Sequence, residues 1–388
     1  MIIPAAKKLD FIQEYYFSKK LREVAQMIAD GKPVINLGIG NPDQAPSPEV
    51  IQTLQDSVAN VKNHGYQSYN GIPALREAIA QFYQRTYQVQ LNPTNEILPL
   101  LGSKEGITYI HQAFLNPGDK VLIPNPGYPT YTSTAKLAGA VPIYYDLDEN
   151  KNWSPDWSSV SEEDLQEAKI VWVNYPHMPT GASGSIEVFK DILDKALKYR
   201  WLIVNDNPYS LVLNPGKPSS FLQIEGSKDC VIELNSLSKS FNLAGMRVGM
   251  ALGHADYIST ILKVKSNVDS GMYRPLQEAA IAALGASDEW HARRNAVYAS
   301  RLATARKIMD ALSCKYLDGQ VGMFLWAKIP DKYEHVEALT ERVLQEANVF
   351  ITPGFIFGTK GERYIRISLC STNENLTEAL ARIKSLAL

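Results

Sequence analysis

The chain has few cysteines, no excess of charge of either sign and no long hydrophobic run. Only three of its 388 residues are cysteines, and they are far apart and odd in number, so we expect free thiols and no disulfide framework. The 39 basic and 41 acidic residues nearly balance, which leaves no global field favouring nucleic acid or an anionic membrane surface. No apolar run is long enough to span a bilayer, and the N-terminus lacks the features of a secretory signal. We therefore expect a cytoplasmic protein with no membrane partner, no nucleic-acid partner and no metal site.

What the chain does contain is a regular alternation of apolar runs and amphipathic stretches. Hydrophobic residues make up 45% of the sequence, which is enough for a large core, and the length suggests about two or three domain-sized units. The apolarity of the runs is continuous, which is typical of strands covered on both faces in a mostly parallel sheet. We therefore predict an α/β unit with strands at 97–101, 120–124, 141–146, 170–174, 201–205, 231–234 and 248–252.

The pattern changes from about residue 289 onward. An Arg-rich helical stretch leads to further strands and helices, which predicts a smaller α+β unit with helices at 292–311 and near 335–348, strands at 324–328 and 364–368, and a final helix. A helix at about 11–30 and a strand at 34–37 precede the large unit and could return to pack on this tail. We predict an N-terminal arm (1–44), a large domain (45–285) and a small C-terminal domain (286–388).

One segment, Ser236-Leu-Ser-Lys-Ser-Phe-Asn-Leu-Ala-Gly-Met-Arg247, follows an apolar run and places a lysine between hydroxyls, with an arginine eight residues further on. A lysine can join the aldehyde of pyridoxal phosphate as a Schiff base, and hydroxyls with a guanidinium can hold its doubly charged phosphate. We therefore interpret Lys239 and Arg247 as anchors of this cofactor. A strand-to-helix turn with capping serines and a solvated lysine is the alternative for this segment alone.

Two residues on the preceding predicted strand and its turn fit the same cofactor. Asp206 ends an apolar run, and its carboxylate could keep the pyridine nitrogen protonated, which makes the ring an electron sink. Tyr209 follows three residues later, and its phenol could bond the cofactor's 3-oxygen. An Asp that caps the next turn is the alternative.

Two further segments could complete a cofactor pocket. Gly102, Ser103 and Lys104 follow a strand and open a helix, whose free N–H groups and dipole suit a phosphate. Tyr128, in the rigid Pro-rich loop 124–131, could stack on an aromatic ring. A simple helix start and an exposed turn tyrosine are the alternatives.

Together these segments resemble the class I and II aminotransferases, a family of fold type I pyridoxal phosphate enzymes, over essentially the whole chain. The stretch 266–277 is similar to that of the LL-diaminopimelate and aspartate aminotransferase-like subgroup. The resemblance implies a large domain with a mostly parallel sheet between helices, a smaller α+β domain, and a homodimer with shared active sites. In that family a lysine, here Lys239, forms the Schiff base, and residues at the positions of Ser236, Ser238 and Arg247 bind the phosphate.

The resemblance also assigns residues outside the large sheet. The loop Gly38–Asp43, with Gly40, is similar to the family's N-terminal substrate-carboxylate loop. Tyr66 matches the tyrosine that reaches the partner subunit's cofactor phosphate, and Arg366 matches the arginine that binds the substrate α-carboxylate.

One motif departs from the family pattern of two asparagines before Pro-Thr-Gly. Asn174 matches the first asparagine, a cofactor-binding position, but Met178 stands where the second usually bonds the cofactor's 3-oxygen. A thioether cannot donate that bond, which Tyr209, His177 or Asn174 could replace.

The resemblance implies an enzyme that moves an amino group between an L-amino acid and a 2-oxo acid, with a 2-oxoglutarate-type acceptor expected. Lys239 would carry the proton between the α-carbon and the cofactor as general base and acid. A carbon–sulfur β-lyase would share every one of these anchors and is the alternative. A cofactor-sensing transcription regulator would need a basic DNA-binding domain, which we do not find in the sequence. A dinucleotide-binding protein would need a Gly-x-Gly-x-x-Gly motif after the first strands of the sheet, which is also absent. The sequence does not disclose the amino donor.

Overall fold

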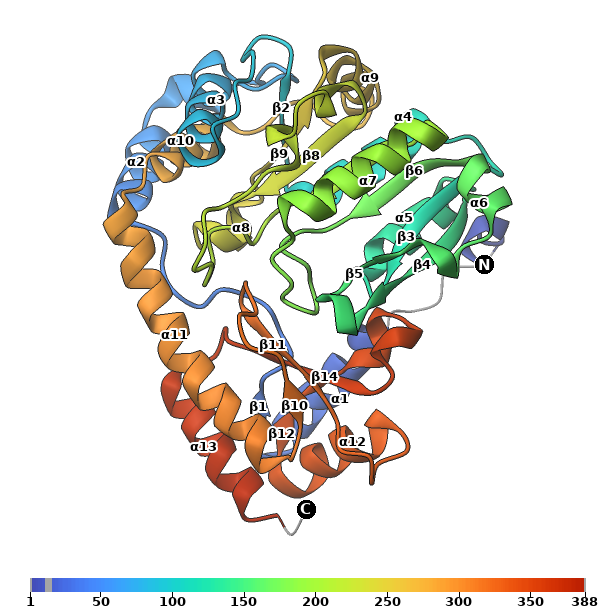
Figure 1. Ribbon diagram of the computed structural model, residues 1–388. Coiled ribbons are helices and arrows are strands. Elements are labelled where there is room, and N and C mark those ends of the chain that lie inside the picture. The colour runs from blue at the N-terminus through green and yellow to red at the C-terminus, as the bar shows by residue number, and fades with distance from the viewer. Residues whose placement is uncertain (1, 11–15, 387–388) are drawn as a thin grey trace.

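A large mixed sheet forms the upper part of the molecule (Figure 1). The computed structural model describes residues 2–10 and 16–386. The sheet has eight strands in the order β2-β9-β8-β7-β6-β3-β4-β5. Their bounds are β2 Ile97–Leu100, β3 Lys120–Asn125, β4 Val141–Asp148, β5 Ser154–Asp156, β6 Ala168–Val173, β7 Leu202–Asp206, β8 Val231–Ser236 and β9 Gly249–Gly253. The strands predicted between residues 97 and 252 are therefore confirmed, and only the short β5 was missed.

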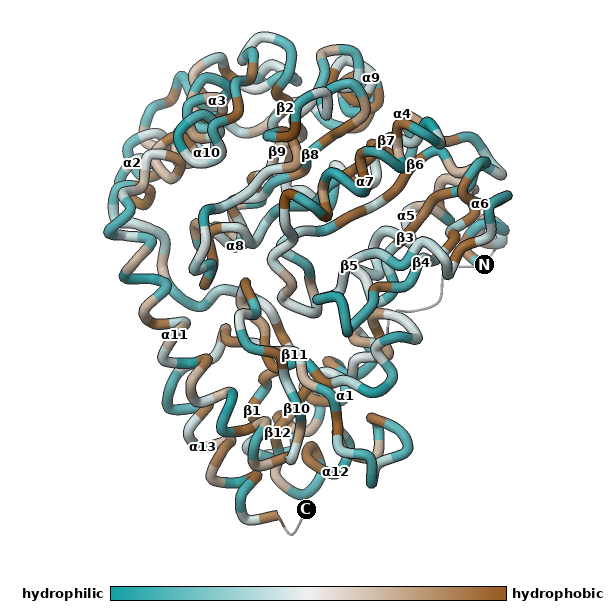
Figure 2. Tube along the Cα trace, in the orientation of Figure 1, coloured by the Kyte–Doolittle hydropathy of each residue, from teal (hydrophilic) through white to brown (hydrophobic). Residues whose placement is uncertain are grey.

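Helices cover both faces of this sheet, which explains the continuous apolar runs. Successive residues of a strand point to opposite faces. On β6, Trp172 packs in one buried cluster with residues of α4, α5 and α9, whereas Val171 and Val173 pack in another that includes α7. The strands are largely hydrophobic along their length, as Figure 2 shows for β6. The helices of this part are α2 Pro48–Ala59, α3 Pro73–Tyr87, α4 Ser103–Phe114, α5 Pro129–Leu137, α6 Glu162–Glu167, α7 Ile186–Tyr199, α8 Leu237–Ser240, α9 Ala255–Lys265 and α10 Arg274–Leu284.

The direction of the strands decides which loops meet. Strands β4, β3, β6, β7 and β8 are parallel to one another, which confirms a mostly parallel sheet. β9 is antiparallel to both β8 and β2, so the two reversals return β2 to the direction of β8. The carboxyl ends of β2, β6, β7 and β8 and the amino end of β9 therefore lie at one edge of the sheet.

A smaller part lies below the large sheet, with a four-stranded antiparallel sheet in the order β10-β11-β14-β13 (Figure 1). The predicted α/β fold class with a smaller α+β unit is thus confirmed. Its strands are β10 Lys315–Tyr316, β11 Phe324–Lys328, β13 Thr352–Pro353 and β14 Tyr364–Ser368, and its helices are α11 Asp288–Ala311, α12 Val336–Ala347 and α13 Asn373–Lys384.

The N-terminal segment packs on this smaller part. β1 (Ile35–Asn36) pairs in parallel with β12 (Val349–Phe350). On α1 (Tyr16–Ala29), Val24 and Met27 share a buried cluster with Leu344 and Phe350. The first residues of the predicted helix 11–30 lie outside the described residues, and the boundaries at 44 and 285 stay predictions. None of the helices in the described ranges is both long enough and apolar enough to cross a membrane.

Candidate active site

Polar residues from distant parts of the chain meet at the carboxyl edge of the large sheet. Asn174 follows β6, Asp206 ends β7 and Ser236 ends β8, while Gly102 opens α4 just after β2. In open α/β sheets this edge is where ligands bind. The topology thus brings together segments that are separated by more than a hundred residues in the sequence.

Lys239 lies on the short helix α8, directly after β8, and is partly buried. Its Nζ donates a hydrogen bond of 2.5 Å to the carbonyl of Gly40. Burial lowers the pKa of the Lys239 ammonium, and the guanidinium groups of Arg366 and Arg247 act in the same direction. A lowered pKa favours the uncharged amine, which is the nucleophile that a carbonyl or aldehyde requires.

A cluster of donors lies beside Lys239. Ser236 Oγ donates to Ser238 Oγ at 2.9 Å, and Arg247 Nη1 donates to Ser238 Oγ at 3.3 Å. Gly102, at the N-terminus of α4, has φ +89°, and a Cβ there would overlap the Arg247 guanidinium. The helix start, two hydroxyls and a guanidinium thus face one small volume, an arrangement that fits a phosphate group.

Only part of the predicted helix start faces this cluster. A Cβ on Gly249, the first residue of β9, would lie 2.6 Å from the main-chain nitrogen of Ser103. Because Gly249 pairs with Ser236, the Ser103 amide lies near this cluster. The Lys104 side chain is exposed, so any part that Lys104 plays falls to its main-chain N–H.

Asp206 is a buried carboxylate with one oxygen engaged. Its side chain is 6% exposed, Oδ2 accepts a hydrogen bond of 2.9 Å from the Tyr131 hydroxyl, and Oδ1 has no hydrogen-bond partner among the described residues. Burial raises the pKa of Asp206 to about 6. A buried acceptor left open in this way fits the protonated pyridine nitrogen of pyridoxal phosphate.

Sequence reasoning missed Tyr131. It lies in the first turn of α5, three residues after Tyr128, and its ring stacks on that of Trp172 with the centroids 4.6 Å apart. Tyr128 meets the Tyr131 ring edge-on at 5.6 Å. The spacing of the two tyrosines was visible, but nothing in the sequence linked the Tyr131 hydroxyl to Asp206, 75 residues away.

The pKa of Asp206 leads to a testable expectation for the cofactor-free protein. Its folded-state pKa of about 6 lies above the ordinary value of 3.8, so its contribution to stability is fully present below about pH 4 and is lost as the pH rises through 6. Relative to Asp206→Asn, wild-type apoprotein should therefore lose up to about 3 kcal/mol of unfolding free energy between pH 4 and 8. Calorimetry of both apoproteins across this range measures the difference, and parallel pH profiles would contradict the expectation.

Asn174 and Tyr209 lie close to Asp206. The Asn174 amide donates to the Asp206 carbonyl, and its Oδ1 accepts from the main-chain nitrogen of Met178 at 2.8 Å. Both polar atoms of this side chain therefore hold neighbouring main-chain segments together. Tyr209 is buried, its ring meets that of Phe324 edge-on at 6.0 Å, and burial raises the pKa of its phenol, which keeps the phenol a donor.

Arg366, on β14, is buried between two aromatic rings. Its guanidinium lies 4.0 Å from the centroid of Phe324 and 4.7 Å from that of Phe357. Nη2 donates to the Gly38 carbonyl at 2.9 Å, and Nη1 lies 3.2 Å from Met178 Sδ. The structure therefore places Met178 against the arginine that the resemblance assigns to the substrate carboxylate. The two phenylalanines are further site residues that the sequence reasoning missed.

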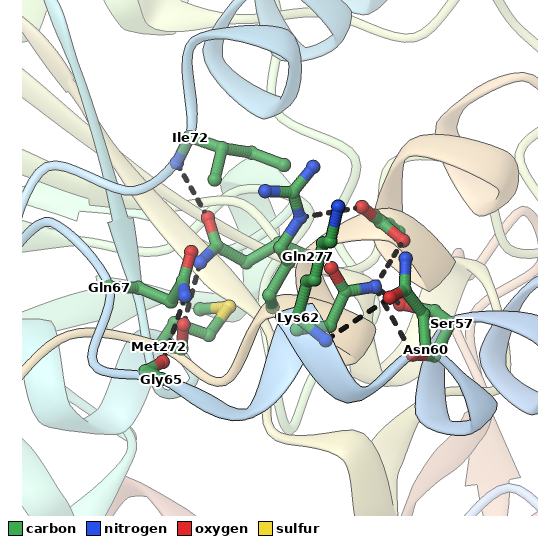
Figure 3. Close-up of polar contacts among 11 residues, drawn as sticks. Ser57, Asn60, Lys62, Gly65, Gln67, Ile72, Met272 and Gln277 are labelled. Carbon is green, nitrogen blue, oxygen red and sulfur yellow. Dashed lines mark hydrogen bonds and ion pairs between the residues drawn. The ribbon is translucent and has the colours of Figure 1, made fainter.

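Tyr66 is a predicted site residue that lies on the surface of the chain. Its side chain is 93% exposed. The segment after it is held firmly, because the Gln277 amide accepts from the Ile72 main chain at 2.7 Å and donates to the Met272 carbonyl at 2.6 Å (Figure 3). The tyrosine is thus presented to solvent from an anchored segment.

The chain is similar to known proteins over almost its whole length. A family model described as aminotransferase class I and II matches residues 32–383. The LL-diaminopimelate aminotransferase of Aquifex aeolicus is 39% identical over 382 residues, which cover 98% of each chain, and that of Dehalococcoides mccartyi is 37% identical over 97% of each. Among solved structures, apo-BacF from Bacillus subtilis matches with a TM-score of 0.95 and 34% identity, over 100% of this chain and 99% of that one. A probable N-succinyldiaminopimelate aminotransferase from Thermus thermophilus matches with a TM-score of 0.88 and 32% identity, over 95% and 99%.

Proposed function

Because the chain belongs to the class I and II aminotransferases, which depend on pyridoxal phosphate, we propose that it moves an amino group between an L-amino acid of the LL-diaminopimelate type and a 2-oxoglutarate-type 2-oxo acid. The observation that carries this proposal is the loop Gly38–Gly40, whose carbonyls contact both Lys239 and Arg366. A nucleophilic amine and a carboxylate-binding guanidinium therefore share one site, as an amino acid substrate requires. The names of the relatives support the diaminopimelate-type substrate.

The cofactor is held by residues of the large sheet in this proposal. Pyridoxal phosphate, when bound, supplies an electron sink for the bond that breaks at the substrate α-carbon. Asp206 Oδ1 accepts from the pyridine nitrogen and keeps it protonated. The residues that hold the phosphate are Ser236, Ser238, Arg247 and the main-chain N–H groups of Gly102, Ser103 and Lys104. Tyr128 would stack on the cofactor ring, and Tyr209 would donate to its 3-oxygen, with Asn174 as a further cofactor-binding residue.

The substrate is oriented by Arg366 and handled by Lys239. The Arg366 guanidinium would bind the substrate α-carboxylate through two parallel hydrogen bonds, which fixes the orientation of the substrate in the site. The Gly40 carbonyl contacts the Lys239 amine, so Gly40 would lie beside the amino group of the substrate. Lys239 would anchor the cofactor, and its amine would take the proton from the substrate α-carbon as general base and pass it to the cofactor as general acid.

A panel of amino donors and 2-oxo acid acceptors tests the proposal. We expect LL-diaminopimelate alone to convert the bound cofactor to its amino form, which is followed by its absorption spectrum. Added 2-oxoglutarate should then take up the amino group, which gives glutamate and restores the original spectrum. Ammonia and pyruvate released from a cysteine-type substrate, with no amino transfer, would instead identify a β-lyase. The cytoplasmic location stays a prediction.

We also propose a homodimer in which Tyr66 reaches the cofactor phosphate of the other subunit. The exposure of this side chain on an anchored segment supports that role. Tyr66→Phe should weaken cofactor binding and lower activity by about tenfold, since one hydrogen bond to a charged group is lost. Hybrid dimers of Tyr66→Phe with Lys239→Ala should regain activity, because one of their two sites then has both residues. Mixed subunits whose activity does not rise above that of Tyr66→Phe alone would contradict a shared site.

A further inference from the structure

The loop Gly38–Asp43 borders the proposed substrate site and contacts two of its groups. The Gly40 carbonyl lies 2.5 Å from Lys239 Nζ, and the Gly38 carbonyl lies 2.9 Å from Arg366 Nη2. The position of this loop therefore sets where the amine and the guanidinium are held.

The N-terminal side of the loop is fixed by main-chain pairing and close packing. Leu37 donates to the Phe350 carbonyl at 2.9 Å and accepts from the Ser368 N–H at 2.8 Å. The Asn36 side chain accepts from the Gly38 N–H at 2.9 Å. A Cβ on Gly40 would overlap the Phe324 ring, so the backbone lies directly on that ring. These contacts end at Gly40.

The C-terminal side is held by an ion pair at Asp43 and, two residues further on, by a hydrogen bond of 3.2 Å from the Asn242 amide to the Ala45 carbonyl. The two terminal guanidinium nitrogens of Arg301, Nη1 and Nη2, donate to the two carboxylate oxygens of Asp43, each at 2.7 Å; Arg301 lies on α11. Arg301 Nη1 also donates to the Leu369 carbonyl at 3.0 Å, three residues beyond Arg366. Arg301 is 5% exposed, so this pair is shielded from solvent on the arginine side. Bidentate pairs of this kind fix geometry as well as adding energy.

We propose that Arg301 is a positioning residue for the substrate carboxylate: it ties Asp43 of the loop to the end of the strand that carries Arg366. One planar guanidinium thereby holds two segments that lie 258 and 68 residues away in the sequence. An ammonium would keep the charge but could not span three acceptors in this fixed arrangement. The effect on substrate rests on the proposed function, whereas the hold on the loop does not.

Hydrogen–deuterium exchange of the holoenzyme without substrate tests the hold on the loop. In Asp43→Asn and Arg301→Lys, peptides covering residues 36–45 should exchange at least about fivefold faster, because a tether is lost while β7 and the core remain intact. Peptides of β7 should exchange as in wild type. Arg306→Lys is the matched control, since Arg306 lies on the same helix and forms a solvent-exposed pair with Asp318 at 3.0 Å. Equal exchange of the loop in all variants would overturn the proposal.

Steady-state kinetics with the best donor of the panel then tests the consequence. Asp43→Asn should raise KM for the amino acid by about tenfold or more with kcat changed by less than about threefold, and Arg301→Lys should fall between this variant and wild type. The cofactor spectrum should not change. A lower melting temperature with unchanged KM would show a purely structural role and overturn the proposal. If wild type transfers no amino group, the proposed function is wrong, and loop exchange alone decides whether Arg301 positions the loop.

Discussion

Replacing Lys239 with alanine is expected to abolish turnover while cofactor still binds. The reacting amine is lost, but the donors that fit the phosphate, Ser236, Ser238 and Arg247, are untouched. Turnover is measured with the best donor, and bound cofactor by absorption after gel filtration. The variant should still bind cofactor. Dialysis should remove this cofactor more readily than it does from wild type, because no covalent bond retains it.

Borohydride reduction separates Lys239 from other lysines. In wild type it should fix the cofactor at Lys239 alone, as identified by mass spectrometry of the digested protein. Lys104→Ala is the matched control, because Lys104 lies at the same edge of the sheet with an exposed side chain. That variant should keep near wild-type turnover. A reduced adduct on Lys104 in wild type would contradict the assignment.

Arg366→Ala is expected to lower kcat/KM for amino acids by about a hundredfold or more. A charge-assisted bidentate contact and its orienting effect are lost together. The structure strengthens this expectation, since the guanidinium is held in place by two aromatic rings and the Gly38 carbonyl before any substrate arrives. The group is therefore preorganised, and its loss is not offset by a flexible neighbour.

The conservative variant Arg366→Lys shows whether geometry or charge dominates. It keeps the positive charge but loses the planar fork, so we expect an efficiency between those of wild type and Arg366→Ala. The spectrum of the bound cofactor should barely change in either variant, which shows that the loss concerns the substrate. Near wild-type efficiency of Arg366→Ala with carboxylate substrates would mean that another residue binds the carboxylate.

The local sequence determined the strands and the order of the motifs. Continuous apolar runs marked β3, β6, β7 and β8 because burial on both sheet faces leaves no room for polar alternation. The segment Ser236–Arg247 indicated the cofactor, and its resemblance to a known family, together with the other motifs, implied the arrangement of the two domains. Those inferences rest on periodicity and on residue types a few positions apart.

Only the tertiary structure decided which distant groups share a contact. The pairs Tyr131–Asp206 and Asp43–Arg301 and the contact of Met178 with Arg366 join residues that lie between 75 and 258 positions apart. Such contacts depend on strand direction and on how the smaller part packs against the large sheet. The reversal of β9, which returns β2 to the direction of β8, is one example. No local pattern encodes it, because a continuous apolar run indicates that both faces of a strand are covered but does not give the direction of one particular neighbour.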